Sequence, residues 1–286
     1  MPSSVDIAVD RFLSPCPPKA AQLIVTIYGD IVEPRGGVLW MGDLISLCAG
    51  SCVNESLVRT AVSRLVTKGQ LAGEREGRRS FYGLTPDARD EYHLAAELFF
   101  GPEDDDCDWI VSHCPDPSDQ TELIRNGFGQ LDGHVFIGAD RPGRPQLGTA
   151  FRSQALSPGG EDLLELAGNV FQLETLSSEY AAFVSAFAPM RELIADLPSQ
   201  QATLLLRLAL VHAFRDIRLR DPRLPRAVLG ASWPGFEARK LFADLYRRLS
   251  DPADTYIGER LLSRNGPLPA TPDAVRKRMD MLAPEP

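Results

Sequence analysis

Apolar residues recur at helical spacing in the first third of the chain. The stretch KAAQLIVTIYGD (19–30) predicts a helix that ends at Gly29, and LWMGDLISLCAG (39–50) predicts a short helix that ends at Gly50. NESLVRTAVSRLVTKG (54–69) predicts a third helix, with Asn54 as its N-cap and Glu55 in the first turn, where the helix dipole favours negative charge. Three helices are therefore expected before Gly69.

The third helix has two chemically different faces. Its apolar face is predicted to pack in a core and its opposite face to meet solvent. The apolar positions are Leu57, Val58, Ala61, Val62, Leu65 and Val66, and the polar ones are Arg59, Thr60, Ser63, Arg64 and Thr67.

The next segments complete a recognisable order of elements. QLAGEREGRRSFYGLT (70–85) predicts a hairpin that turns near Glu76 and Gly77. Thr85 and Pro86 then suit the start of a further helix, through ARDEYHLAAELFF. Helix, helix, helix, hairpin, helix is the order of a winged helix-turn-helix DNA-binding domain, which we assign to residues 20–102. Residues 1–19 are expected to be a flexible tail, and the last residues, LAPEP, to be frayed.

Beyond the acidic loop GPEDDDCD, which we take as a domain boundary, strand and helix patterns alternate. DWIVSHCP and GHVFIGAD predict strands, DQTELIRNGFGQL and GGEDLLELAGNV predict helices, and FQLETL predicts a short strand; 148–154 has no clear pattern. The alternation predicts a small α/β domain over 103–177. Strand patterns vanish from Ser178 onward, which predicts an all-helical domain over 178–286. The expected fold class is α+β with several domains.

Composition excludes several classes of protein. No apolar run approaches the roughly 20 residues of a membrane span, and the N-terminus lacks a signal-peptide core. The five cysteines include no CxxC pair and the four histidines are scattered, so we expect reduced thiols and no metal site. A cytoplasmic protein without membrane contact is expected.

Charge is distributed unevenly. The whole chain has a formal net charge of -9, yet residues 55–82 contain six basic against three acidic residues, a local +3. A positive region of this kind suits phosphate contact, because releasing the counterions of DNA supplies much of the binding affinity. We expect double-stranded DNA contacts from Asn54, Ser56, Arg59, Thr60, Ser63 and Arg64 on the helix, and from Arg75, Arg78 and Arg79 on the hairpin. The alternative is that these arginines only solvate an exposed surface and pair with Glu74 and Glu76.

The same region resembles the PaaX family, bacterial repressors of phenylacetate-degradation operons. Residues in matching places are Arg59, Thr60, Ala61, Arg64, Leu65, Gly69, Leu71, Arg75, Gly77, Arg78, Arg79, Ser80, Phe81, Tyr82 and Leu84, whereas Gln70 stands where the family usually has an aromatic residue. The C-terminal half matches at His212, Arg215, Asp221, Pro222, Leu224, Pro225, Trp233, Gly235, Ala238, Arg239, Leu245 and Tyr246. The middle domain is similar mainly in its order of elements, and the resemblance implies that it is ferredoxin-like.

The resemblance also implies a homodimer on a palindromic operator, released when an aryl-acyl-CoA such as phenylacetyl-CoA binds. A second basic segment, 200–226, has six arginines against Asp216 and Asp221 and offers a place for this anion. Candidate effector contacts are Arg207, His212, Arg215, Arg218, Trp233 and Arg239. The alternative is that the arginines make structural ion pairs, Trp233 is a core residue and His212 is simply packed.

The sequence contains none of the common catalytic signatures. GxSxG, GxxxxGK[ST], HExxH and GxGxxG are all missing, so we expect neither an enzyme nor a bound cofactor. A CoA-thioester-dependent enzyme and a ligand-sensing scaffold that does not bind DNA remain as alternatives.

Overall fold

The computed structural model describes residues 18–101, 107–155 and 161–283, and their contacts divide the chain into two compact units. The first unit is formed by the described parts of Met1–Gly101, Ser185–Arg215 and Lys240–Pro286, and the second by those of Pro102–Val184 and Asp216–Arg239. The predicted helical region 178–286 contributes to both units. The division into three domains is a different partition and stays a prediction. The predicted tail up to residue 17, most of the acidic loop and the final residues lie outside the described residues.

The first helix runs past its predicted end. Helix α2 (Ala20–Ile27) continues as a π-helical turn (Tyr28–Val32) and a 3-10 turn (Glu33–Arg35), and Gly36 ends it with a φ of +104°. The prediction that Gly29 ends this helix was wrong. A Cβ on Gly29 would lie 2.6 Å from the Tyr92 ring, whose hydroxyl donates a hydrogen bond to the Gly29 carbonyl. Glycine at position 29 leaves room for the Tyr92 ring.

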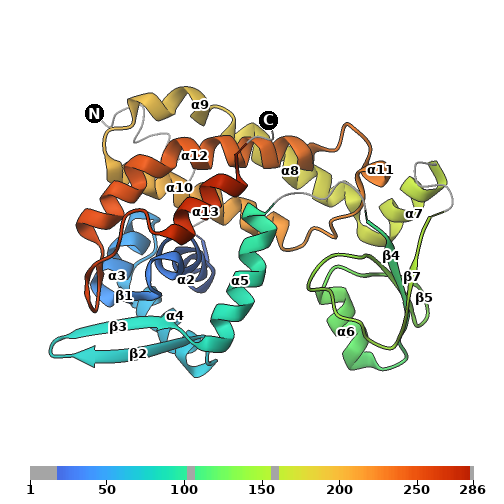
Figure 1. Cartoon of the computed structure of the whole chain (residues 1–286), viewed down its shortest axis with the longest axis horizontal. Coiled ribbons are helices and arrows are strands. Elements are labelled where there is room, and N and C mark those ends of the chain that lie inside the picture. The colour runs from blue at the N-terminus through green and yellow to red at the C-terminus, as the bar shows by residue number, and fades with distance from the viewer. Residues whose placement is uncertain (1–17, 102–106, 156–160, 284–286) are drawn as a thin grey trace. The chain divides into compact units, whose positions relative to one another are not determined.

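The rest of the N-terminal segment follows the predicted order (Figure 1). The elements are β1 (Val38–Trp40), α3 (Met41–Gly50), α4 (Glu55–Thr67), β2 (Leu71–Glu76), β3 (Arg79–Leu84) and α5 (Pro86–Phe100). Strands β1, β3 and β2 form an antiparallel sheet in that order. The structure adds one element that was not predicted, strand β1, so Leu39 and Trp40 belong to this strand and not to the following helix.

Local capping explains these boundaries. The Asn54 side chain accepts a hydrogen bond of 3.0 Å from the Leu57 N–H, and that of Thr85 accepts one of 3.3 Å from the Ala88 N–H, with Pro86 in the first turn. Gly77 turns the hairpin with a φ of +58°. The predicted caps and the turn at Gly77 are confirmed.

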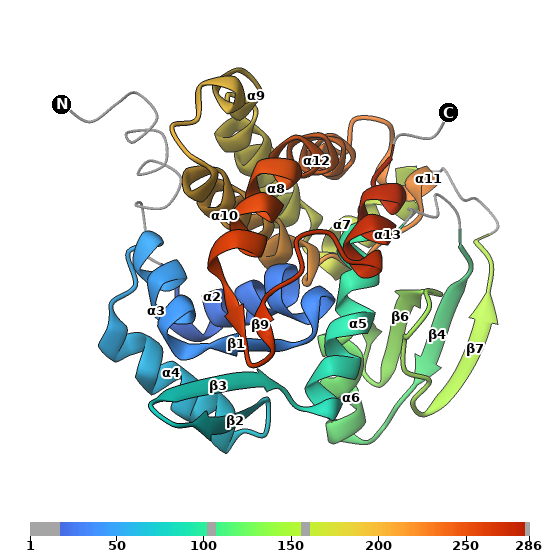
Figure 2. The same cartoon turned by 60° about the vertical axis from the view of Figure 1, so that its left-hand side comes forward.

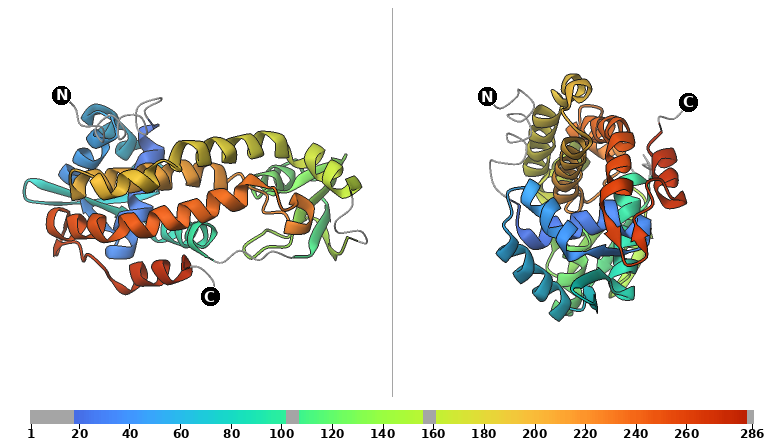
Figure 3. Two further views of the ribbon diagram at one scale, coloured as in Figure 1. Left: turned by 90° about the horizontal axis from the view of Figure 1, so that it is seen from above. Right: turned by 90° about the vertical axis from the view of Figure 1, so that its left-hand side faces the viewer.

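The C-terminal part of the first unit is mainly helical. Its elements are the end of α8 (Leu173–Phe187), α9 (Met190–Leu193), a 3-10 turn (Ile194–Asp196), most of α10 (Gln200–Arg218), much of α12 (Pro234–Arg260), β8 (Leu262–Ser263), β9 (Gly266–Pro267) and α13 (Asp273–Met281). After α12 the chain forms the short β8–β9 hairpin and returns as α13 (Figure 3). The expectation of no strands after Ser178 was therefore wrong at this hairpin.

The second unit contains a four-stranded antiparallel sheet. Its elements are β4 (Trp109–His113), α6 (Pro117–Arg125), β5 (Gly129–Asp132), β6 (Val135–Ala139), β7 (Thr149–Ser153), α7 (Glu161–Phe171), α11 (Arg226–Leu229) and parts of α8, α10 and α12. The strand order is β5-β6-β4-β7, with every neighbouring pair antiparallel. Helices with antiparallel sheets make the described fold α+β, as predicted.

Three predictions in this unit need correction. The helix over 119–131 ends at Arg125, and residues 129–131 belong to β5. The pattern-free segment 148–154 contains β7, whose residues are mostly exposed and so show no alternation. FQLETL is not a strand: Phe171 ends α7, Gln172 turns the chain and Leu173 begins α8, where Leu173, Leu176 and Tyr180 are buried at helical spacing.

Candidate nucleic-acid interface

Helix α4 presents a row of small polar side chains to solvent. Ser56, Thr60 and Ser63 are exposed, whereas Val58, Ala61, Val62 and Leu65 on the other side are buried. The Thr60 hydroxyl donates to the Ser56 carbonyl at 2.9 Å, which leaves its oxygen able to accept a further hydrogen bond.

Two apolar residues of α4 do not pack as expected. Leu57 is 54% exposed and Val66 is 39% exposed, so the prediction that both belong to the core was wrong. At 100° per residue the four buried positions form a narrow stripe, and these two flank it on either side. The solvent-exposed face of α4 is consequently wider than predicted and is partly apolar.

The two arginines of α4 differ in their partners. Arg59 forms an i,i+4 ion pair of 2.7 Å with Glu55. Arg64 forms no ion pair within the part of the chain that the structure describes. Its guanidinium is thus the α4 cation most available to an anionic ligand.

The β2–β3 hairpin places its arginines on different faces. Directly paired residues of an antiparallel ladder share a face, and alternate residues of one strand do too. Glu76 pairs with Arg79, and Arg75 pairs with Ser80, so Arg75 and Arg79 lie on opposite faces, with Arg78 at the turn between them. The Arg79 guanidinium lies over the Trp40 ring at 5.1 Å, and Arg75 Nε donates to the Gly77 carbonyl at 3.2 Å.

The hairpin glutamates do not neutralise the hairpin arginines. Glu74 and Glu76 both form ion pairs with Arg264, in the turn between β8 and β9. Within the described residues, none of the hairpin arginines makes an ion pair. The sequence-based alternative, in which these arginines pair with Glu74 and Glu76, is therefore not what the structure contains. Nothing in the sequence indicated that Arg264 pairs with these glutamates, because Arg264 lies 190 positions from Glu74.

Arg207, the first of the candidate effector residues, is closed to any ligand. It is fully buried in the first unit, where Nε donates to Asp30 at 3.0 Å and Nη1 to Asp254 at 2.6 Å. Arg35 donates to the same Asp254 oxygen at 2.7 Å, and the Tyr246 hydroxyl donates to Asp30 at 2.8 Å. This network joins segments far apart in sequence, and the structural alternative is correct for Arg207.

The remaining candidates fall into two groups. His212 and Arg215 lie in the first unit, whereas Arg218, Trp233 and Arg239 lie in the second. His212 Nδ1 is hydrogen-bonded to the Thr26 hydroxyl at 2.9 Å, and Arg215 lines a cavity.

In the second unit Arg218 and Trp233 meet around one tyrosine. The Tyr180 hydroxyl and the Arg218 guanidinium both donate to the Asp221 carboxylate, at 2.6 and 3.0 Å, and the Trp233 ring lies edge-on to Tyr180 at 6.1 Å. Burial, followed by the neighbouring carboxylate, raises the pKa of Tyr180 well above its ordinary value. Arg239 is half-buried on α12.

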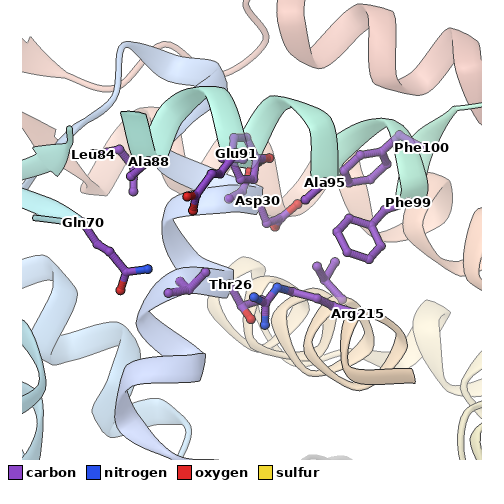
Figure 4. A pocket seen from close by; sticks show the side chains of 14 residues that line it. Thr26, Asp30, Gln70, Leu84, Ala88, Glu91, Ala95, Phe99, Phe100 and Arg215 are labelled. Carbon is purple, nitrogen blue, oxygen red and sulfur yellow. Dashed lines mark hydrogen bonds between the residues drawn. The ribbon is translucent and has the colours of Figure 1, made fainter. Parts of the chain in front are cut away.

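The cavity beside Arg215 has a volume of about 250 Å³ and is lined by residues of α2, α5 and α10 with Gln70 and Leu84. Figure 4 shows Gln70, Thr26, Glu91 and Arg215 around a common space, with Phe99 at one end. The cavity can hold a single aromatic ring with a polar group, but it is too small for a whole nucleotide-bearing cofactor. Sequence analysis found only Arg215 here, because the other residues come from segments that meet only in the folded chain.

The described residues offer neither a metal site nor a membrane span. They contain no cluster of three or more His, Cys, Asp or Glu residues arranged to hold a metal ion. In the same part of the chain, no helix is both long and apolar enough to cross a membrane.

Comparisons with known proteins agree on one family. Residues 19–88 match the family model described as PaaX-like protein, and residues 171–259 match that described as PaaX-like protein C-terminal domain. The chain is also 28% identical to a protein of Escherichia coli (strain K12) named transcriptional repressor PaaX, over 94% of this chain and 92% of that protein. The two matched segments together cover more than half of the 286 residues. The chain therefore belongs to the PaaX-like protein family.

Proposed function

We propose that this chain is a DNA-binding transcriptional repressor whose affinity for its operator is controlled by a small ligand. The observation that carries the proposal is the set of exposed arginines that form no ion pair in the described residues: Arg64 on α4, and Arg75, Arg78 and Arg79 on the β2–β3 hairpin. The E. coli relative is named a transcriptional repressor, which supports the same role here.

In this proposal α3, α4 and the β2–β3 hairpin act as a winged helix-turn-helix. Helix α4 enters the major groove, where Arg64 suits the O6 and N7 acceptors of guanine, and Ser56, Thr60 and Ser63 suit base edges. Asn54 caps α4 and also lies at the end of the helix that faces DNA. The hairpin arginines contact phosphates on either side of the hairpin, and Arg59 has the weaker role because of its pair with Glu55.

We propose a homodimer that binds a palindromic operator of aromatic-acid catabolism genes of the phenylacetate type. An aryl-acyl-CoA releases it by binding preferentially to a dimer whose two α4 helices no longer match successive major grooves, because only such differential affinity shifts the equilibrium. The cavity of the first unit, lined by Arg215 and by Thr26, the hydrogen-bond partner of His212, is large enough for the aryl group alone. Arg207 has no part in this contact, since it is buried.

We further propose that the second unit is a variant of the ferredoxin-like fold. Its strand order β5-β6-β4-β7 and antiparallel pairing support that fold. The variation is that β6 and β7 are joined by a loop without a helix, and α7 follows β7. In this proposal, Arg218, Trp233 and Arg239 of this unit contribute to binding the effector or to forming the dimer interface.

The test measures binding of the purified protein to DNA from upstream of its own and neighbouring genes, with phenylacetyl-CoA, free CoA or phenylacetate added. Specific retention of one fragment, relieved by the aryl-CoA and not by free CoA, is the expected result. Failure to retain any fragment more tightly than random DNA at matched salt contradicts the repressor. Turnover of an acyl-CoA without specific DNA retention would instead support a CoA-dependent enzyme.

A further inference from the structure

The β8–β9 hairpin lies beside the β1-β3-β2 sheet, close to the hairpin that we propose as the DNA-binding wing (Figure 2). The Leu262 N–H donates to the Asp43 carboxylate at 2.7 Å, which anchors β8 to α3. Ser263 closes the turn, because its hydroxyl accepts from the Asn265 N–H at 3.1 Å and donates to the Gly266 carbonyl at 2.8 Å. The turn therefore holds Arg264 in a defined place. Arg264 lies outside both segments that match the PaaX-like family models, 19–88 and 171–259.

Arg264 faces the two acidic residues of the β2–β3 hairpin. Nη1 forms an ion pair with Glu74, and Nε lies 3.9 Å from Glu76. Both glutamates lie on the same face of the hairpin as Arg79, because Glu76 is the direct partner of Arg79 and Glu74 is two positions away on the same strand. Arg79, directly opposite Glu76 in the β2–β3 pairing, is the hairpin arginine that shares this face with the two carboxylates.

The charge of Arg264 bears on how strongly the β2–β3 hairpin attracts DNA phosphates. Three arginines against two glutamates leave the β2–β3 hairpin with one net positive charge, and Arg264 adds a second. Two uncompensated carboxylates beside Arg79 would repel phosphates and compete with them for its guanidinium. Arg264 is itself 54% exposed, and exposed ion pairs add little to folding stability, so the fold does not depend on this pair.

We propose that Arg264 is a positioning residue for DNA binding, which neutralises Glu74 and Glu76 so that the hairpin arginines remain available to phosphates. The inference rests on the proposed function of this hairpin. It extends the interface to a C-terminal segment remote in sequence.

The experiment compares four proteins on the same operator fragment: the wild type, Arg264→Ala, Glu74→Gln/Glu76→Gln, and the triple variant. Arg264→Ala is expected to weaken binding roughly five- to tenfold and to flatten the dependence of affinity on salt by about one phosphate contact. Arg264→Lys should retain most of the affinity, since it keeps the charge. The triple variant should bind as tightly as Glu74→Gln/Glu76→Gln, because without the two carboxylates Arg264 has nothing to neutralise.

Arg276→Ala is the matched control, since Arg276 is also exposed and ion-paired, with Asp273 within α13. It should bind DNA as the wild type does, and every variant should unfold at the wild-type temperature. The inference is overturned if Arg264→Ala binds like the wild type, or if its loss persists undiminished in the triple variant, which would mean direct contact with DNA. If the wild type itself shows no preference for any fragment, the repressor proposal fails first and this inference fails with it.

Discussion

Arg207 and Asp254 form a fully enclosed ion pair, with Nη1 2.6 Å from the carboxylate oxygen. The same guanidinium also binds Asp30, and the three side chains come from α10, α12 and the turn that extends α2. The pair thus joins the N-terminal segment to the C-terminal helices of the first unit. A residue that seemed suited to a ligand is instead part of the core.

Replacing Arg207 with alanine should destabilise the first unit strongly. The change leaves Asp30 and Asp254 buried with less compensating charge, and breaking a buried pair from one side costs about 3–5 kcal/mol. Urea unfolding measures the loss. Arg191→Ala is the control, because the Arg191 pair with Asp244 is exposed, and it should change stability by less than about 1 kcal/mol. Equal effects of the two changes would contradict the structural role of Arg207.

On α4, Arg64→Ala should reduce operator affinity more than Arg59→Ala. Loss of a bidentate base contact costs about 1–3 kcal/mol and relaxes specificity at that base pair. Arg59 is already engaged by Glu55, so its removal should cost less. Gel-shift titrations against the operator and single-base variants distinguish the two. If Arg59→Ala proved the more damaging, the assignment of Arg64 would be wrong.

Arg78→Ala should weaken binding to all DNA sequences alike. Arg78 lies at the turn of the hairpin, where we propose phosphate contact, so its loss should lower the slope of log affinity against log salt by about one. Arg125→Ala is the control, since Arg125 is exposed on α6 of the second unit. A change of sequence preference in Arg78→Ala, with the slope intact, would point to base contact instead.

Gly29→Ala should destabilise the fold by about 1–3 kcal/mol, because the added Cβ would lie 2.6 Å from the Tyr92 ring and force it to move. Gly168→Ala is its counterpart within helix α7, where a Cβ meets nothing within 4 Å. Alanine there should stabilise by up to about 1 kcal/mol. Thermal unfolding of the two variants should move in opposite directions, and a shift in the same direction would refute the packing role of Gly29.

Alkaline pH should weaken the first unit through Cys48. Burial raises the pKa of this thiol from 9.0 to about 12, so between these values the unfolded chain loses a proton that the folded chain keeps. Ionisation then favours the unfolded state, and stability should fall as pH rises from about 9 towards 12. Unfolding free energies at pH 8 and 10.5 measure this fall, and it should be smaller in Cys48→Ala. An identical fall in both proteins would exclude Cys48 as a source.

Local sequence signals were enough to predict much of the secondary structure of the N-terminal segment. The caps at Asn54 and Thr85 and the turn at Gly77 depend on residues within a few positions of each other, and all three were predicted. Short apolar runs were less informative. FQLETL alternates like a strand over its first residues, and only the longer spacing of buried residues to Tyr180 identifies the helix.

By itself, the sequence determined the order of the helices and the β2–β3 hairpin from α2 to α5, the positive charge concentrated in α4 and this hairpin, and the resemblance to a family. These follow from periodicity, capping and composition, which act along the chain. The tertiary structure decided which charges are satisfied. It buried Arg207 between Asp30 and Asp254, and it brought Arg264 to Glu74 across 190 positions. Ion pairing depends on distance in space, and neither the type of these residues nor their spacing along the sequence indicates which residues they pair with.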